Sequence, residues 1–175
     1  MSSASRAAVA PAVNVHASAT ASGGRLPYGV ARPGDNRCMR LRWDDGPGLD
    51  ITDQAQLDET LRALSGGAAA CPRVAYLVGE AGALGLGLDA AGDGMLLFAP
   101  AGSGRPALHS VGQPASGEGD LTFYVSGRRY VFSGRCRVPA QTVREAARQY
   151  LATGVLPGCV VWEPEPSPPS HQEQG

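Results

Sequence analysis

The chain has 175 residues and a mass of 18.0 kDa, which suits one ordinary domain and is too short for the two-domain plan of most cofactor enzymes. Its hydrophobic fraction of 43% allows a packed core, whereas 24 Gly and 14 Pro predict long loops or unstructured stretches. All 15 cationic side chains are Arg, which excludes lysine-based catalysis, and the net charge of −1 gives no reason to expect direct nucleic-acid binding.

Both ends of the chain have compositions typical of disorder. Residues 1–36 are rich in Ala, Ser, Gly and Pro without helical or strand periodicity, so we predict a disordered leader there. The alternative for this stretch is a signal peptide, with Arg6 before the apolar run Ala7 to Val15. Residues 164–175 read as a Pro-rich disordered tail. No stretch is long and apolar enough to predict a membrane span.

Residues 37–163 are the predicted domain, which begins with a strand and a helix. Apolar residues alternate with arginines in the first segment, the period-2 pattern of a half-buried strand: Met39, Leu41 and Trp43. Asp53 and Gln56 then stand at the distance of a capping box. Leucines at helical spacing follow, and Gly66 ends the predicted helix: Leu57, Leu61 and Leu64. Asp58 and Arg62 are spaced to form an ion pair on it.

The rest of the domain predicts a meander, a second helix and a last strand. Connections between the apolar segments 74–78, 84–88 and 95–98 are so short that they force antiparallel pairing. A short strand at 108–111 and a hairpin over 121–132 are expected next. A helix follows, with Pro139 in its first turn, Gly154 at its end and one apolar face, and 160–162 is the last strand. This order predicts an α+β domain with two helices packed on an antiparallel sheet.

Signals for catalysis, cofactors and metals are weak. His109 is the sole histidine of the predicted domain and lies in the 99–119 loop without a nucleophile signature, so no enzyme is predicted and no catalytic residue is assigned. The run Gly85 to Ala90 is close to a dinucleotide-binding fingerprint but lacks the helix that must follow it. No cofactor or metal is expected, because the cysteines show no metal-site spacing and fit mostly buried, reduced thiols: Cys38, Cys71, Cys136 and Cys159.

The C-terminal third carries a more specific pattern. After the predicted helix come Gly154, Pro157, Val160 and Trp162, a G-x-x-P-x-x-V-x-W run, and an antiparallel meander precedes them. Over roughly residues 74–162 this arrangement resembles the family-one immunity proteins of bacterial polymorphic toxin systems. The resemblance implies a cytoplasmic, non-catalytic protein that binds and blocks a cognate toxin domain encoded by a neighbouring gene, such as a nucleic-acid deaminase or nuclease.

The charge distribution suggests where such a partner would bind. Residues 43–120 carry eleven acids against three Arg, and residues 121–162 carry six Arg against one acid, which predicts a dipolar surface. A toxin that acts on nucleic acid presents a cationic groove, which an acidic surface can occupy. We therefore expect partner contacts from acids at strand ends and turns and from one tryptophan: Asp44, Asp45, Glu80, Asp89, Asp93 and Trp162.

Two other functions fit the same sequence. The first is a small ligand-binding or enzymatic domain with a pocket near the 99–119 loop and His109, since loops of that length often carry function. The second is a scaffold that oligomerises through an exposed strand edge.

Overall fold

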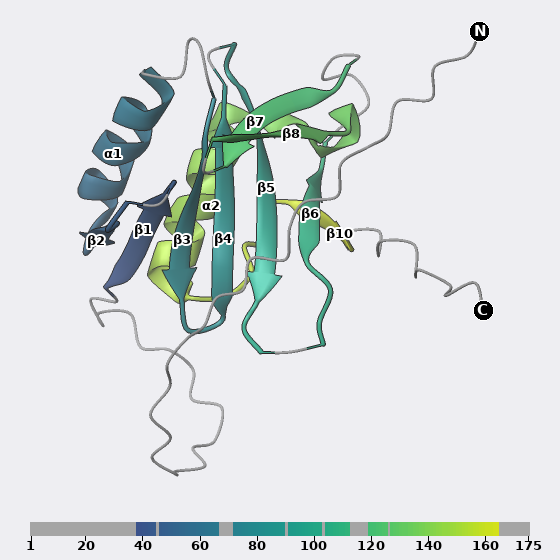
Figure 1. Ribbon diagram of the computed structural model, residues 1–175. Helices are drawn as coiled ribbons and strands as arrows, with labels where there is room; N and C mark the ends of the chain where they lie inside the picture. Colours follow the sequence, from purple (N-terminus) through teal and green to yellow (C-terminus); the bar gives the residue numbers. More distant parts are fainter. Residues whose placement is uncertain are drawn as a thin grey trace, which may run out of the picture.

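A large antiparallel sheet organises the chain in the computed structural model (Figure 1). Across the sheet the strands run in the order β10-β6-β5-β4-β3-β1-β2, and a short strand, β9, pairs with the start of β5. Their bounds are β1 Met39–Trp43, β2 Leu49–Ile51, β3 Val74–Gly79, β4 Gly82–Leu88, β5 Asp93–Pro100, β6 Leu108–Val111, β9 Val138–Pro139 and β10 Val161–Pro164. The meander predicted from the short connections is therefore the centre of the sheet.

The structure describes most of the predicted domain. The predicted leader, the tail from residue 165, Asp45 and Cys71 lie outside the described residues, which are 38–44, 46–66, 72–89, 91–102, 104–112, 119–125 and 127–164. Strand β10 includes Pro164, the first residue of the predicted tail, which pairs with Leu108 of β6.

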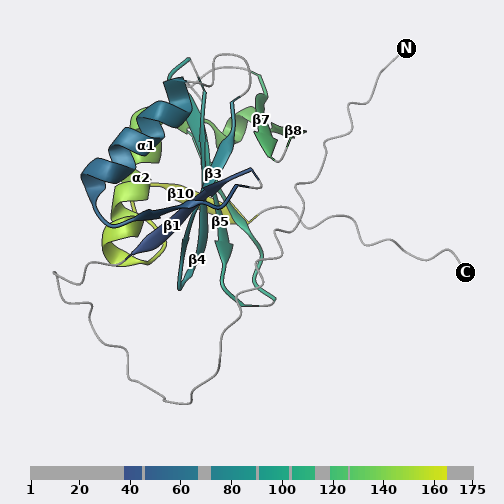
Figure 2. The ribbon, with the colours of Figure 1, turned by 60° about the vertical axis from the view of Figure 1, so that its left-hand side comes forward.

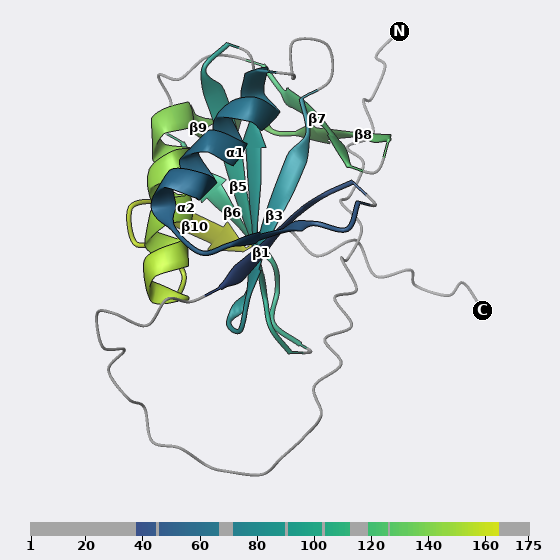
Figure 3. The same cartoon turned by 90° about the vertical axis from the view of Figure 1, so that its left-hand side faces the viewer.

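Two helices cover one face of the sheet, α1 (Gln54–Gly66) and α2 (Ala140–Thr153), and both lie on the same side in Figures 2 and 3. Alternate strand residues pack beneath them, including Leu41, Leu77 and Leu84, each with no exposed surface. Burial of these apolar side chains is the main force that holds the layers together. The predicted α+β architecture, with helices on an antiparallel sheet, is confirmed.

A separate hairpin covers part of the opposite face. It consists of β7 (Leu121–Val125) and β8 (Arg128–Phe132), and a 3-10 helix, η1 (Gly134–Cys136), follows it. A second apolar cluster lies beneath this hairpin, with Phe123 at its centre. A Cβ atom on Gly87 would lie 3.0 Å from the Phe123 ring, so the glycine allows the hairpin to approach the sheet closely.

The helix ends follow the sequence signals. The backbone N–H of Gln56 donates to Asp53 Oδ1 at 2.9 Å, and the Gln56 side chain accepts from the backbone N–H of Thr52 at 3.0 Å, which is a capping box shifted to include Thr52. Gly154 ends α2 with a φ of 69°, and its N–H donates to the Tyr150 carbonyl at 2.7 Å. Neither described helix has the length and apolar character needed to span a bilayer.

Three local expectations differ from the structure. Strands β2 and β9 have no counterpart in the sequence analysis, because strands of three and two residues are too short to show periodicity. Asp58 pairs with Arg148 of α2, at 2.8 Å between Arg148 Nη2 and Asp58 Oδ2, and not with Arg62. Among the described cysteines only Cys136 is buried, whereas Cys38 and Cys159 are exposed.

Candidate partner-binding site

An open apolar groove lies at the end of the sheet where β3 turns into β4 and where β5 leads into β6. Its volume is about 370 Å³, and it is lined by residues from four segments: Ala81, Phe98, Pro100, Arg105, Pro106, Leu108, Val155 and Leu156. A pocket of this size can take one large apolar side chain or two small ones. We call this region the groove end of the molecule.

The loop after α2 forms one wall of the groove and is tied down by polar contacts. The indole N–H of Trp162 donates to the Pro157 carbonyl at 2.9 Å, and the N–H of Gly158 donates to Gln149 Oε1 at 3.2 Å. The N–H of Val155 donates to Thr153 Oγ1 at 3.4 Å. The G-x-x-P-x-x-V-x-W run therefore builds a short, fixed loop between α2 and β10.

This fixed loop displays two apolar side chains to solvent. Val155 is 58% exposed and Leu156 is 37% exposed, and both stand beside the largely buried Phe98. Exposed apolar side chains that adjoin a pocket are typical of binding surfaces. Because the loop is already ordered, little conformational entropy is lost when a partner covers it.

Arg105 is the one charged residue in the groove lining. Its side chain is exposed and makes no ion pair with any other described residue. Glu80, in the β3–β4 turn next to Ala81, is also exposed. Both signs of charge are thus present at the groove end.

The other end of the sheet carries three of the predicted partner-binding acids, Asp44, Asp89 and Asp93, and we call it the acidic end. Asp44 follows β1, and Asp89 and Asp93 flank the β4–β5 turn. The seven residues of β4 separate this turn from the groove end, a distance of roughly 20 Å at the usual strand rise.

Each of the three carboxylates at the acidic end has a contact within the fold. Asp44 Oδ2 lies 3.0 Å from Arg73 Nη1, and Asp93 Oδ2 lies 2.6 Å from Arg137 Nη1. Asp89 Oδ1 accepts the backbone N–H groups of Ala91 and Asp93, both at 2.9 Å. These acids hold turns and neighbouring segments in place, and partner contacts from them stay a prediction.

The remaining predicted residues divide as follows. Glu80 and Trp162 are at the groove end, where the Trp162 ring packs edge-on against Phe98 with centroids 6.4 Å apart. Asp45 lies outside the described residues. Sequence reasoning missed Val155, Leu156 and Arg105, although two apolar residues between a helix-ending glycine and Pro157 were a signal that could have identified this loop.

Blocks of opposite charge along the chain are brought together by folding. Arg137 and Arg148, from the basic segment, pair with Asp93 and Asp58 of the acidic segment. Arg40 lies 3.9 Å from Asp50. The unequal distribution along the sequence is therefore partly cancelled in three dimensions.

His109 lies on the sheet face away from the groove. Its Nε2 atom is 3.9 Å from Glu163 Oε2, and Arg135 Nη2 lies 3.2 Å from each oxygen of the same carboxylate. The buried hydroxyl of Ser110 donates to the Cys136 carbonyl and accepts the Leu96 N–H, so both of its bonds are with the backbone. The 99–119 loop does line a groove, as the ligand-binding alternative expects, but His109 is not among its lining residues.

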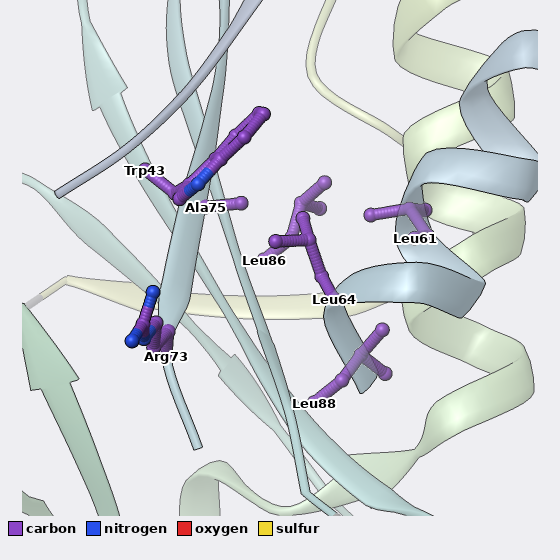
Figure 4. A pocket seen from close by; sticks show the side chains of 7 residues that line it. All are labelled: Trp43, Leu61, Leu64, Arg73, Ala75, Leu86 and Leu88. Carbon is purple, nitrogen blue, oxygen red and sulfur yellow. The ribbon is translucent and has the colours of Figure 1, made fainter. Parts of the chain in front are cut away.

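A second cavity lies between α1 and the sheet. Its volume is about 10 Å³, room for roughly one water molecule, and Leu61 and Leu64 of α1 point into it toward Leu86 and Leu88 (Figure 4). It is a packing gap of the core. Among the described residues no three His, Cys, Asp or Glu side chains gather as a metal site.

Comparison with known proteins identifies the family. The family model described as Immunity protein Imm1 matches residues 45–164. The chain belongs to this family. A search of the curated proteins finds no match.

The Imm1 match covers the whole groove end. Every residue that lines the groove, from Ala81 to Leu156, lies within residues 45–164, as do the four residues of the G-x-x-P-x-x-V-x-W run. The resemblance inferred from that run is confirmed, and the Imm1 family gives the chain an immunity-protein role in toxin systems. The same match also includes Asp89 and Asp93 of the acidic end, so it establishes the family and does not locate a partner site.

Proposed function

We propose that this protein binds and neutralises a cognate toxin, encoded by a neighbouring gene, without catalysing any reaction. Membership of the Imm1 family is the single observation that carries the proposal. The position of His109, away from the groove and beside a carboxylate that Arg135 also contacts, supports a role without catalysis.

The mechanism we propose is steric occlusion. A stable protein–protein interface buries about 1,600 Å² in total, enough to cover an enzyme's substrate groove. Affinity in such an interface comes mainly from a few buried apolar anchors, whereas charges mainly accelerate association. Glu80 is exposed and suited to attract a cationic toxin. The acids Asp44, Asp89 and Asp93 would add to the negative electrostatic field of the protein while they keep their contacts within the fold.

The toxin class we favour is a nucleic-acid deaminase or nuclease, because such enzymes need a cationic substrate groove. A toxin of this class has to be blocked where the nucleic acid is, so the proposal places this protein in the cytoplasm. Direct contact between this protein and nucleic acid is not part of the mechanism.

Titration of toxin activity tests the proposal. The toxin domain encoded next door is assayed on its substrate while the purified full chain is added in increasing amounts. A blocker that acts by occlusion lowers activity in proportion to its amount and abolishes it at one chain per toxin. Full neutralisation by a small fraction of an equivalent would indicate an enzyme, and unchanged activity at a large excess would contradict the proposed function.

A further inference from the structure

We propose that the groove end is the anchor site for the toxin and that it takes an apolar side chain of the toxin that stands beside a carboxylate, with the carboxylate bound by Arg105. The inference rests on the proposed function and adds to it the location and the chemistry of the contact.

The apolar part of the inference follows from the walls of the groove. Seven of its eight lining residues are apolar, and two of them, Val155 and Leu156, remain exposed on a loop that three hydrogen bonds hold in place. Covering these side chains removes apolar surface from water, which favours binding, and the loop is already in position. An anchor residue that fills a preformed apolar pocket is the usual form of an interface hot spot.

The carboxylate part follows from Arg105. Arg137 and Arg148 have carboxylate partners within the fold at 2.6 and 2.8 Å, whereas Arg105, like several other exposed arginines among the described residues, has none. Arg105 differs from those arginines because it lines the apolar groove. A guanidinium group next to an apolar wall binds a carboxylate with two parallel hydrogen bonds, and the apolar surroundings strengthen the contact. Charge complementarity at the groove therefore favours an acidic group on the toxin, even where the toxin as a whole is cationic.

The first test uses surface plasmon resonance to measure how full-length variants bind the toxin domain encoded by the neighbouring gene. Val155→Asp places a charge in the groove wall, and Val161→Asp is its matched control, because Val161 is 67% exposed on β10 and does not line the groove. We expect Val155→Asp to raise Kd by about 30-fold or more through faster dissociation, and Val161→Asp to change it by less than about threefold.

The charge is tested in the same way with Arg105→Gln. Its matched control is Arg128→Gln, which removes an exposed arginine from the β7–β8 hairpin. We expect about a tenfold rise in Kd for Arg105→Gln and less than about twofold for Arg128→Gln. The inference would be overturned if each variant and its control raised the Kd for the toxin equally while the parent chain bound tightly. That result would leave the proposed function intact. No binding by the parent chain would instead contradict the proposed function.

A small probe tests the chemistry without the toxin. 4-Phenylbutyrate carries an apolar ring and a carboxylate, and its amide lacks only the charge. In methyl NMR titrations up to about 10 mM we expect the acid to shift Leu156 and Leu108 more than the amide does, and Arg105→Gln to remove the difference. Equal shifts from acid and amide, or no shift from either, would overturn the carboxylate assignment. A dimer of the chain alone that Val155→Asp dissociates would make a second copy the occupant and would also overturn the inference.

Discussion

The acidic end and the groove end of the sheet differ in whether their surface side chains already have partners within the fold. At the acidic end Asp44, Asp89 and Asp93 look like binding residues in the sequence, yet each contacts an arginine or a backbone N–H of its own chain. At the groove end Val155 and Leu156 look like ordinary loop residues, yet they stay exposed on a fixed loop. The contacts that a group already makes within the fold, rather than its residue type, distinguish a group that holds the fold from one that is available to a partner.

The largest expected effect is on the acidic end. Asp93→Asn removes the charge that faces Arg137, whose side chain is only 14% exposed, and leaves a largely buried guanidinium without its counter-ion. We expect the free energy of unfolding to fall by about 2 to 3 kcal/mol in urea denaturation, with the Kd for the toxin unchanged within about twofold. Glu80→Gln, as the exposed control, should change stability by less than about 0.5 kcal/mol. Equal free energies of unfolding for the two variants would show that Asp93 does not stabilise the fold.

A hydrogen bond inside the groove end gives the next largest effect. The hydroxyl of the fully buried Tyr150 donates to the Gly82 carbonyl at 2.8 Å and ties α2 to the β3–β4 hairpin. Tyr150→Phe leaves that carbonyl without this partner, so we expect a loss of about 1 to 2 kcal/mol in unfolding free energy. A loss no larger than that of a partly buried control, Tyr124→Phe on β7, would show that the bond contributes nothing.

The same hydroxyl makes stability depend on alkaline pH. Burial raises the pKa of Tyr150 above its ordinary value of 10.0. The folded chain then keeps a proton that the unfolded chain has lost, so this contribution to stability is complete below pH 10 and is lost as the pH rises through the folded-state pKa. Thermal unfolding at several pH values should show a steeper alkaline loss for the parent than for Tyr150→Phe, and parallel curves would contradict this assignment.

Trp162→Phe should produce a smaller effect, of about 1 kcal/mol, because it removes the indole N–H that donates to Pro157 and keeps most of the contact with Phe98. The substitution also loosens the loop that displays Val155 and Leu156. We therefore expect faster hydrogen exchange at Gly158 and a rise of a few-fold in the Kd for the toxin. A lower stability with unchanged exchange and Kd would mean that the tryptophan supports the core and does not position the loop.

The smallest effect concerns long-range attraction. Glu80→Lys and Glu59→Lys change the net charge equally, but Glu80 is at the groove end and Glu59 lies on α1. With a cationic toxin we expect Glu80→Lys to slow association about two- to fivefold at low salt, more than Glu59→Lys does, and both differences to fade at high salt. Identical rates for the two variants would show that the attraction does not depend on location.

The parts of the fold that could be predicted depend on local patterns. Helical spacing of Leu57 and Leu61, the capping box at Asp53 and the short strand connections all act within a few residues, and the structure follows them. Contacts between residues that lie far apart in the sequence could not be predicted from such local patterns. Asp58 prefers Arg148, 90 residues away, over Arg62 one turn along its own helix, because the bidentate contact at 3.0 and 2.8 Å forms only once the two helices lie together.

The candidate site follows the same rule. Trp162 and Glu80 were predicted from residue type and position, and the structure places Trp162 against the groove residue Phe98 and Glu80 next to Ala81, while their partner contacts stay a prediction. The groove itself joins Ala81, the 100–108 loop and the 154–156 loop, which no local pattern relates. The ion pairs of Asp44 with Arg73 and of Asp93 with Arg137 were not predicted, because a sequence shows charges but not which arginines fold against them.

Methyl NMR of the full chain with unlabelled toxin directly tests whether the toxin binds at the groove end. Val155, Leu156 and Leu108 report on the groove, and Val161 is an internal control that is more exposed than either loop residue. We predict that one equivalent of toxin shifts or broadens the three groove methyl signals and leaves Val161 unchanged. Unperturbed groove signals in a complex that has formed would show that the toxin does not bind at the groove end.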